Sequence, residues 1–448
     1  MVREKPELLI PAGGLETLKV AVDYGADAVY IGGNRFGLRA KADNFTHDEM
    51  VEARVITREA GVKLYVTTNI FAHNEDVIKA RDYFEELRDI GVDAVLISDP
   101  GMFSIAREVL KGSSTEIHIS TQANNTNYMT YRFWKDMGAT RVVAARELSL
   151  KEIKEIRDNI PEDMEVEAFM HGAMCISYSG RCLLSNYFTG RDANRGACTH
   201  PCRWKYVVME ENRPGEYLPV EEDERGTYIF NSKDLCMVDK IPDLINAGID
   251  SFKVEGRMKT NLYVAVTTRT YREAIDDYYK DPAIYESKLD YYKEEIGACT
   301  MRDFTRGFYY GKPSEEDQIY DNNTYIQNAV YMGRIEEISD GKSNEHSEDG
   351  NYAGIEIIQK NKFSVGDILE VMDYKENISV EVVEIKDEYG RNMENAPHPK
   401  QRLSLVIKAV NNEVINNQVA NSSYTIKENL NGIIRRGMIL RKIIKNQE

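Results

Sequence analysis

The segment GADAVYIGG at residues 25–33 sets a pattern that organises the first half of the chain: a glycine, a short lead-in, an apolar strand and then a loop. The same order recurs in GVKLYVTTN (61–69), GVDAVLISDP (91–100) and GATRVVAARE (138–147). Each glycine suits the left-handed end of a helix. The strands are rich in Val, Ile, Leu and Tyr, as parallel strands buried on both faces are. The pattern therefore predicts repeated β–α units.

Eight strand candidates extend this pattern, and they alternate with amphipathic stretches such as Asp76–Ile90 and Leu148–Asn159. The candidates are Glu7–Ile10, Ala28–Ile31, Lys63–Asn69, Ala94–Ser98, Ile117–Thr121, Arg141–Ala145, Glu165–Met170 and Ser251–Glu255. Eight β–α units predict an α/β fold, a (β/α)8 TIM-like barrel with its helices outside the sheet. An open, doubly wound sheet is the alternative.

The chain divides into a barrel region, a connector and a second domain. We expect the barrel over residues 1–280, with a cysteine-rich insertion at 171–236, and a connector over 281–325. From residue 326 to 448, short alternating strands such as AVYMGRIEEIS and ISVEVVEIK follow one another without helices between them. This change predicts a small all-β barrel domain at the C-terminus.

Composition and charge exclude several classes of protein. Among 448 residues, 57 are Lys or Arg and 74 are Asp or Glu, for a net charge of −17. Such a chain does not hold nucleic acid by bulk positive charge, although a local basic site remains possible. No apolar run reaches the roughly 18 residues of a membrane span, and the start lacks a signal-peptide pattern. We therefore expect a cytoplasmic protein without a membrane partner.

Five of the six cysteines lie close together in the sequence, and the sixth, Cys299, lies in the connector. The five are Cys175, Cys182, Cys198, Cys202 and Cys236. Disulfides are rare in the cytosol, so this clustering indicates metal or redox chemistry. The spacing matches neither zinc-finger pairs nor a ferredoxin run, but thiolates need only converge in space. A 4Fe–4S cluster and a structural zinc site both remain open, with a disulfide pair as a third alternative.

Basic residues surround these cysteines. The stretch 171–206 holds five Lys or Arg against one acid, a net of +4, and the tail 425–448 also has a net of +4. Positive charge favours thiolate over thiol and attracts an anionic substrate such as a carboxylate or a phosphodiester. The sequence therefore predicts a local anion site in a chain that is acidic overall.

The run EAFMHGAMCISYSGRCLLSNYFTGRDANRGACTHPCRW (167–204) resembles the signature of the collagenase-like peptidase family U32. Further matches, in order, are GADAVYIGG, RAKADNF (39–45), STQANNTN (120–127), NSKDLC (231–236) and FKVEGRMK (252–259). The C-terminal segment, with KFSVGDILEVM, is similar to the small β-barrel extension of that family. The resemblance thus covers both the barrel region and the second domain.

The resemblance implies oxygen-independent hydroxylation with a 4Fe–4S cluster and with prephenate, a small dianionic co-substrate, as the hydroxyl donor. One barrel followed by one β-barrel in about 450 residues is similar to the branch that makes 5-hydroxyuridine at the wobble position of the tRNA anticodon. The ribosomal-RNA branch has additional domains. The implied partner is the tRNA anticodon loop, and the electron donor is unknown.

The resemblance also implies site residues. Cys175, Cys182 and Cys198 match the first three cluster ligands; Cys236 matches the usual fourth, with Cys202 as its competitor. Arginines, lysines and amides at the strand ends are candidates for substrate binding, and Glu167, His171 and Glu255 for proton transfer or positioning. The substrate-binding candidates are Arg39, Asn44, Gln122, Asn124, Arg146, Lys253, Arg257 and Lys259.

Two functions from other classes remain as alternatives. The first is a collagenase-like cysteine or metal peptidase. The chain has no H-E-x-x-H and no G-x-S-x-G motif, so a Cys175–His171 pair is the form that a peptidase site would take here. The second is a non-catalytic RNA-binding metalloprotein. If the protein acts on RNA or binds it, aromatics near the cysteines such as Tyr178, Tyr187, Phe188 and Trp204 are candidates for stacking on bases, with core packing as the alternative role.

Overall fold

The computed structural model describes the chain over residues 4–37, 44–175, 177–204, 207–208, 218–219, 231–299, 302–313, 318–319, 327–339, 351–373, 377–410 and 430–444. Arg39 lies outside the described residues. The chain forms two compact units. The first comprises Met1–Thr260, Thr270–Lys293 and Met301–Ile326, and the second comprises Asn261–Arg269, Glu294–Thr300 and Gln327–Glu448.

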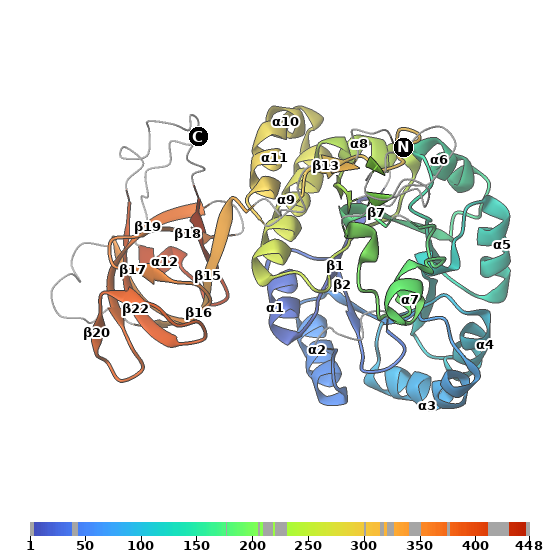
Figure 1. Cartoon of the computed structure of the whole chain (residues 1–448), viewed down its shortest axis with the longest axis horizontal. Coiled ribbons are helices and arrows are strands. Elements are labelled where there is room, and N and C mark those ends of the chain that lie inside the picture. Colours follow the sequence, from blue (N-terminus) through green and yellow to red (C-terminus); the bar gives the residue numbers. More distant parts are fainter. Residues whose placement is uncertain are drawn as a thin grey trace. The chain divides into compact units, whose positions relative to one another are not determined.

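The first unit contains a closed barrel of eight parallel strands (Figure 1). Each strand pairs with the next, and the last pairs with both the seventh and the first. The strands are β1 (Glu7–Pro11), β2 (Ala28–Gly32), β3 (Lys63–Thr68), β4 (Ala94–Ile97), β5 (Glu116–Ile119), β6 (Arg141–Val143), β7 (Glu165–Ala173) and β12 (Ser251–Val254). The predicted (β/α)8 barrel is confirmed.

Helices follow the strands and end where the sequence repeats begin. Gly91, Gly138 and Gly248 each take the left-handed conformation directly after a helix, because a residue without Cβ adopts it at little cost. The helices of the first half are α1 (Leu15–Asp23), α2 (His47–Glu59), α3 (Asn74–Ile90), α4 (Pro100–Val109), α5 (Tyr128–Met137) and α6 (Leu150–Asp158). Later helices are α8 (Ile241–Ala247), α9 (Asn261–Lys280), α10 (Pro282–Ser287) and α11 (Leu289–Gly297).

The barrel interior contains a buried network of charged side chains. Arg141 is 1% exposed, and its guanidinium lies 2.6 Å from a Glu7 oxygen, 2.6 Å from a Glu165 oxygen and 3.2 Å from a Glu167 oxygen. Lys253 Nζ lies 2.6 Å from the other oxygen of Glu167. Because an unpaired charge is costly in a protein interior, these side chains depend on one another.

The cysteine segment begins where β7 ends, and the chain then returns to the same strand. Strand β11 (Asp234–Cys236) pairs antiparallel with the end of β7, with Asp234 opposite Ala173, and β13 (Phe304–Thr305) pairs with β11. Between β7 and β11 lie α7 (Leu184–Thr189) and the single 3-10 turns η2 (Ala193–Arg195) and η3 (Pro201–Arg203). Figure 1 shows α7 over the barrel strands. Short antiparallel pairs link β8 (Val207–Val208) with β9 (Leu218–Pro219) and β10 (Asn231–Ser232) with β14 (Gln318–Ile319).

Six antiparallel strands of the second unit close into a ring, because β18 pairs with both β23 and β19. Alternate residues along β19 and β22 are buried and form part of one apolar core. The strands are β15 (Ala329–Ser339), β16 (Tyr352–Gln359), β18 (Ile368–Met372), β19 (Asn377–Lys386), β22 (Arg402–Ala409) and β23 (Ile439–Ile443). Smaller elements are β17 (Phe363–Ser364), β20 (Asn392–Met393), β21 (Asn395–Ala396) and α12 (Leu430–Ile433). The predicted all-β domain is confirmed.

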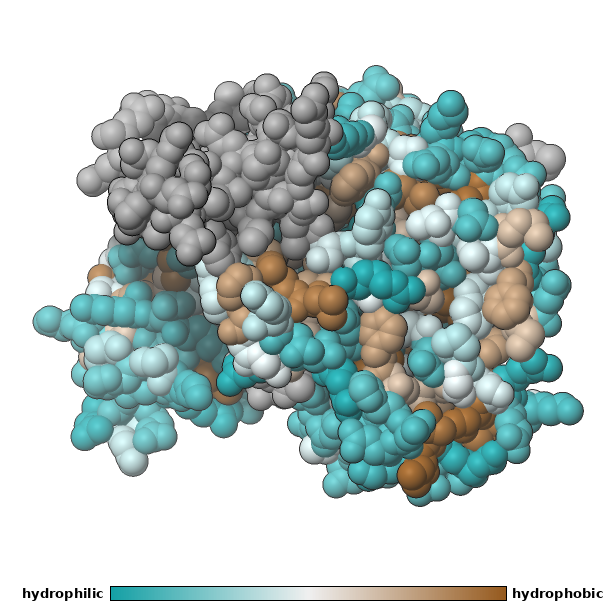
Figure 2. All heavy atoms as spheres, turned by 45° about the vertical axis from the view of Figure 1, so that its right-hand side comes forward, coloured by the Kyte–Doolittle hydropathy of each residue, from teal (hydrophilic) through white to brown (hydrophobic). Residues whose placement is uncertain are grey.

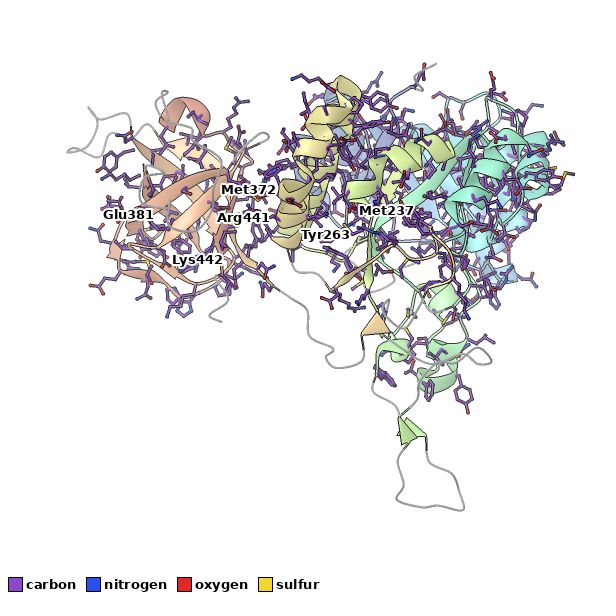
Figure 3. The ribbon with its side chains drawn as sticks, turned by 90° about the horizontal axis from the view of Figure 1, so that it is seen from above. Met237, Tyr263, Met372, Glu381, Arg441 and Lys442 are labelled. Atoms are coloured by element: carbon purple, nitrogen blue, oxygen red, sulfur yellow. The ribbon has the colours of Figure 1, made fainter. Side chains whose placement is uncertain are left out.

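The basic tail is partly engaged inside its own unit. Arg441, labelled in Figure 3, is 1% exposed, and its guanidinium lies 2.9 Å from Glu295 and 2.8 Å from Glu370. Lys442 Nζ lies 2.8 Å from Asp367. These two positive charges of the tail therefore contribute less to an anion site than the sequence count suggests.

The face of the molecule seen in Figure 2 is mainly hydrophilic. On the face seen in Figure 2, apolar side chains appear as separate groups among hydrophilic ones. In the parts of the chain that the structure describes, no helix is both long enough and apolar enough to cross a membrane.

Candidate functional site

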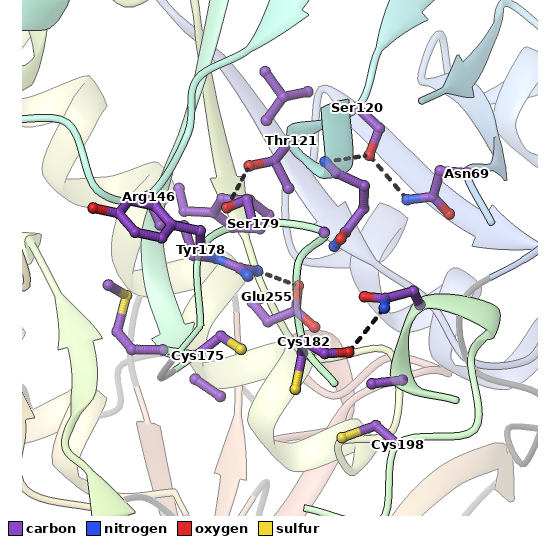
Figure 4. Close-up of a pocket in the computed structure, with 18 of the residues that line it drawn as sticks. Asn69, Ser120, Thr121, Arg146, Cys175, Tyr178, Ser179, Cys182, Cys198 and Glu255 are labelled. Carbon is purple, nitrogen blue, oxygen red and sulfur yellow. Dashed lines mark hydrogen bonds and ion pairs between the residues drawn. The ribbon is translucent and has the colours of Figure 1, made fainter. Parts of the chain in front are cut away.

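A cavity of about 160 Å³ lies at the carboxyl-terminal ends of the barrel strands (Figure 4). Its lining comes from strand ends and loops such as Asn69, Gln122 and Arg146, and from the cysteine segment. The cysteine segment approaches the barrel closely at Gly180, where a Cβ would lie only 2.2 Å from the carbonyl oxygen of Gln122. This is the end of the fold at which such barrels build their active sites.

Four of the six thiols line this cavity: Cys175, Cys182, Cys198 and Cys202. The other two do not. Cys236 is buried on β11, with its Sγ 3.7 Å from the Tyr271 hydroxyl, and Cys299 is buried with its Sγ 3.2 Å from the carbonyl oxygen of Ile296. Burial raises the pKa of the Cys236 thiol. All six thiols are free of disulfides.

The four cavity thiols are candidate ligands for a metal group. In the described residues, no three His, Cys, Asp or Glu side chains lie close enough together to hold a single metal ion. A tetrahedral zinc site needs four ligands about 2.0–2.3 Å from one point, whereas in a 4Fe–4S cluster each thiolate binds a different iron. By their chemistry, the four thiols that line the cavity supply the donor type that both groups use.

Three basic side chains share the cavity with the thiols: Arg146, Lys253 and Arg257. Arg146 lies with its guanidinium carbon 4.0 Å from the centre of the Phe169 ring, and Lys253 Nζ lies 4.5 Å from the centre of the Tyr30 ring. A Cβ on Gly32 would lie 1.7 Å from Nη1 of Arg257, so glycine at position 32 is what gives Arg257 its place. The cavity can therefore receive an anion.

Two carboxylates form ion pairs with these basic side chains: Glu255 with Arg146, and Glu167 with Lys253. Glu255 lines the cavity, and its Oε2 lies 3.2 Å from Nη2 of Arg146. Glu167 is fully buried below the cavity and contacts Lys253 and Arg141. Burial opposes its ionisation, but these two positive charges outweigh burial and lower its pKa. Glu167 is thus a charged group that positions Lys253 rather than one that faces the cavity.

His171 does not face the cavity. Its Nδ1 lies 3.2 Å from the Tyr271 hydroxyl, and its ring packs edge-on against Tyr271. Burial, helped by the charge of Lys259, lowers its pKa to about 3. The pairing of β7 with β12 shifts register between Phe169 and His171; this bulge turns His171 away from the face that Phe169 shares with the cavity. A Cys175–His171 catalytic pair is therefore not formed in this structure.

The remaining candidates divide between the cavity and its surroundings. Gln122 lines the cavity, whereas Asn44, Asn124 and Lys259 do not. Sequence reasoning missed the polar lining residues Ser120, Thr121, Ser179 and Asn194. Asn69, which also lines the cavity, donates from Nδ2 to Ser120 Oγ at 2.9 Å. For Ser120 and Thr121, their position directly after β5 was the available signal.

Gly180 offers a test of the contact between the cysteine segment and the barrel. It has φ of +72°, and its missing Cβ leaves room for the Gln122 carbonyl. We expect Gly180→Ala to lower the free energy of unfolding by more than about 1 kcal/mol, because it adds a clash to the backbone strain. Gly112 has φ of +84° and open space around it. Gly112→Ala should therefore lower the free energy of unfolding only by the backbone strain. Thermal melts of both variants check this, and equal costs would contradict it.

Two protein-family models match this chain, and both describe domains of the same family. The model of "Peptidase family U32" matches residues 13–319, and that of "Peptidase family U32 C-terminal domain" matches residues 341–417. The tRNA hydroxylation protein P1 of Bacillus subtilis is 40% identical over 402 residues, which cover 90% of this chain and 92% of that protein.

Two further relatives carry different names. The tRNA hydroxylation protein P of Escherichia coli is 37% identical over 435 residues, covering 88% of this chain and 92% of that protein. A protein named collagenase from Porphyromonas gingivalis is 32% identical over 338 residues, covering 73% of this chain and 79% of that protein. The resemblance drawn from the sequence motifs is confirmed, and the chain belongs to peptidase family U32.

Proposed function

We propose that this protein hydroxylates tRNA without oxygen and makes 5-hydroxyuridine at the wobble position of the anticodon. The relatives named tRNA hydroxylation proteins support the reaction class, since two of them match about nine-tenths of the chain. The observation that carries the proposal is the cavity in which four thiols and three basic side chains meet. A peptidase needs no such combination.

The proposed cofactor is a 4Fe–4S cluster held by Cys175, Cys182, Cys198 and Cys202. All four line one cavity, whereas Cys236, the usual fourth position in the family signature, lies buried against Tyr271. This difference favours Cys202 as the fourth ligand. When bound, a cluster with all four irons held by cysteine would supply electrons at the wall of the cavity.

The proposed co-substrate is prephenate, a dianion. Arg146 and Arg257 would each grip a carboxylate through two parallel hydrogen bonds, and Lys253 would add a point charge. Glu167 holds Lys253 from below, which fixes the position of the ammonium group. Glu255, paired with Arg146, is placed at the cavity wall where it can orient that arginine or hold a proton.

The target base must leave its stack before chemistry can occur on its ring. An anticodon loop is single-stranded and presents bases that are already accessible, which lowers the cost of extrusion. A local basic site in an acidic chain suits a short loop rather than a long duplex. This is why the anticodon loop is the proposed partner.

Two measurements test the proposal. Protein purified without oxygen should be brown and contain about four iron and four sulfide per chain; colourless protein loaded with zinc would reject the cluster. A host that lacks the gene should lose 5-hydroxyuridine-type nucleosides from its tRNA, as measured by mass spectrometry, and regain them with the gene. An unchanged profile in a host without an overlapping enzyme would reject tRNA hydroxylation.

Arg146 provides a test of the dianion site. We expect Arg146→Met to weaken prephenate binding roughly tenfold or more, because charge-assisted hydrogen bonds to a carboxylate are lost. Arg146→Lys should restore part of the affinity, since it keeps the charge but not the paired hydrogen bonds. Calorimetric titration of each variant measures this. Unchanged affinity in Arg146→Met would place the dianion elsewhere.

Peptidase activity is the second candidate function, because one relative is named collagenase. Gelatin cleavage by highly purified protein, lost in Cys175→Ala, would favour it. The separation of His171 from the cavity speaks against the Cys175–His171 form of such a site.

A further inference from the structure

Three large aromatic side chains stand exposed beside the cysteine-lined cavity. Tyr187 is 84% exposed, Phe188 43% and Trp204 46%. The ring centres of Tyr187 and Phe188 lie 5.3 Å apart, and those of Phe188 and Trp204 lie 6.3 Å apart. The three rings therefore form one continuous group, which we call the aromatic platform.

The aromatic platform is held in a defined place. The Ser185 and Thr199 hydroxyls lie 3.0 Å apart, the Thr199 amide donates to Ser185 Oγ at 3.0 Å, and the Thr189 hydroxyl lies 3.1 Å from that of Thr199. These hydrogen bonds connect α7, which carries Tyr187 and Phe188, to the segment that leads to Trp204. The platform thus sits on a bonded scaffold rather than on a loose loop.

The same scaffold forms the cavity wall. Leu184 and Cys182, just before the two platform residues of α7, line the cavity, and so does Cys202, two residues before Trp204. Asn194 Nδ2 donates to the Cys182 carbonyl at 2.8 Å, which links the turn η2 to the same wall. A molecule that reaches from the cavity onto this segment meets the platform.

The charge around the platform identifies the kind of partner. Arg181 and Arg191 are exposed on the same segment, whereas its one acid, Asp192, is used to accept the Asn194 amide at 2.8 Å. Exposed aromatic faces on a segment with a net positive charge suit unstacked bases and their phosphates. We propose that the aromatic platform stacks on bases of the single-stranded RNA loop next to the base that enters the cavity. This inference rests on the proposed function only in taking an RNA loop as the substrate.

Intrinsic fluorescence gives a direct readout of the platform. The chain has two tryptophans. Trp134 is 7% exposed and donates to Asn125 at 2.9 Å, so a change in emission on adding RNA reports on Trp204. We expect an anticodon stem-loop to quench this emission, and a duplex of the same stem without the loop to leave it unchanged. Trp204→Phe should abolish the change in emission.

Binding of labelled stem-loop RNA to the anaerobically purified protein, measured by anisotropy without co-substrate, tests the energetics. Tyr187→Ala and Trp204→Ala should each weaken binding by about 5- to 150-fold, the range found for loss of one stacked base. Tyr187→Phe should bind as the wild type does. Tyr389→Ala is the matched control, because Tyr389 is 73% exposed and has Arg391 5.0 Å from its ring, and its affinity should not change.

Each other outcome has a distinct meaning. Wild-type affinity in both alanine variants, with iron content retained, overturns the platform and leaves the proposed function intact. Unchanged RNA affinity together with a change in oligomeric state would assign the platform to a second copy of the chain, which also overturns the inference. Loop-dependent quenching and weakened binding, in a protein that forms no 5-hydroxyuridine, would support the platform and reject the proposed function.

Discussion

Serine in place of Cys182 or Cys198 is expected to leave anaerobically purified protein with almost no iron, against about four iron per chain in the wild type. A cluster with an oxygen ligand in place of one thiolate is bound less tightly, since iron–sulfur clusters are held by thiolates. Hydroxylation of tRNA should fall to the level of a host without the gene. Iron and sulfide assays, with tRNA nucleoside analysis of complemented hosts, measure both effects.

The remaining cysteines supply the controls. Cys202→Ser should behave like Cys198→Ser, because both thiols line the cavity. Cys236→Ser and Cys299→Ser should keep their iron, because both side chains are buried outside that lining. If Cys236→Ser lost iron while Cys202→Ser retained it, the fourth ligand would lie on β11 and the proposed ligand set would be wrong.

Arg141→Met is expected to lower the free energy of unfolding by about 3–5 kcal/mol, which is the cost of leaving buried charges without their partner. The variant removes a guanidinium that is 1% exposed and contacts Glu7, Glu165 and Glu167. Chemical denaturation at neutral pH measures the loss. Lys19→Met, which breaks an exposed pair with Glu52 at 3.1 Å, should change stability by less than about 1 kcal/mol. Equal losses in the two variants would show that the buried network contributes little.

The same network predicts a dependence on pH. Burial disfavours the ionised form of Glu7, but the charge and hydrogen bonds of Arg141, together with the Tyr65 hydroxyl, outweigh it and lower the pKa of Glu7 from 4.5 to about 2. A carboxyl whose pKa is lower in the folded state stabilises the fold above its unfolded pKa. The contribution of Glu7 should therefore be lost as the pH falls from about 4.5 to about 2, and Arg141→Met should lack this dependence.

The barrel could be predicted because its parallel strands are short apolar runs and most of them are introduced by a glycine that follows a helix. Strand β11 could not be predicted, since its three residues, Asp234–Cys236, show no periodicity and pair with β7 only because the chain returns there. The extension of β7 to Ala173 has the same origin. Local sequence patterns thus predicted the repeated strands and helices of the barrel. They did not predict β11, which forms only through its contact with β7.

Some residues of the candidate site could likewise be predicted from the sequence, and others could not. Lys253, Glu255 and Arg257 were predictable because they lie near the end of a strand, or just after it, and the carboxyl end of that strand must face the cavity. The position of His171 was not predictable. Strand alternation would place its side chain on the same face as Phe169, and only the bulge between the two residues turns the side chain to the other face. Sequence spacing alone could not show that Cys202 lines the cavity and Cys236 does not. That difference arises because Cys236 lies on β11, which pairs with β7.

The pairing of β11 with β7 also anchors both ends of the cysteine segment. The segment leaves from Ala173 and returns at Asp234, and these two residues are direct partners in the sheet. Closing so long an excursion costs chain entropy, and the strand pairing offsets part of that cost. We therefore expect the barrel to fold in protein purified without iron, so that the proposed cluster would be inserted into a segment whose ends are already joined.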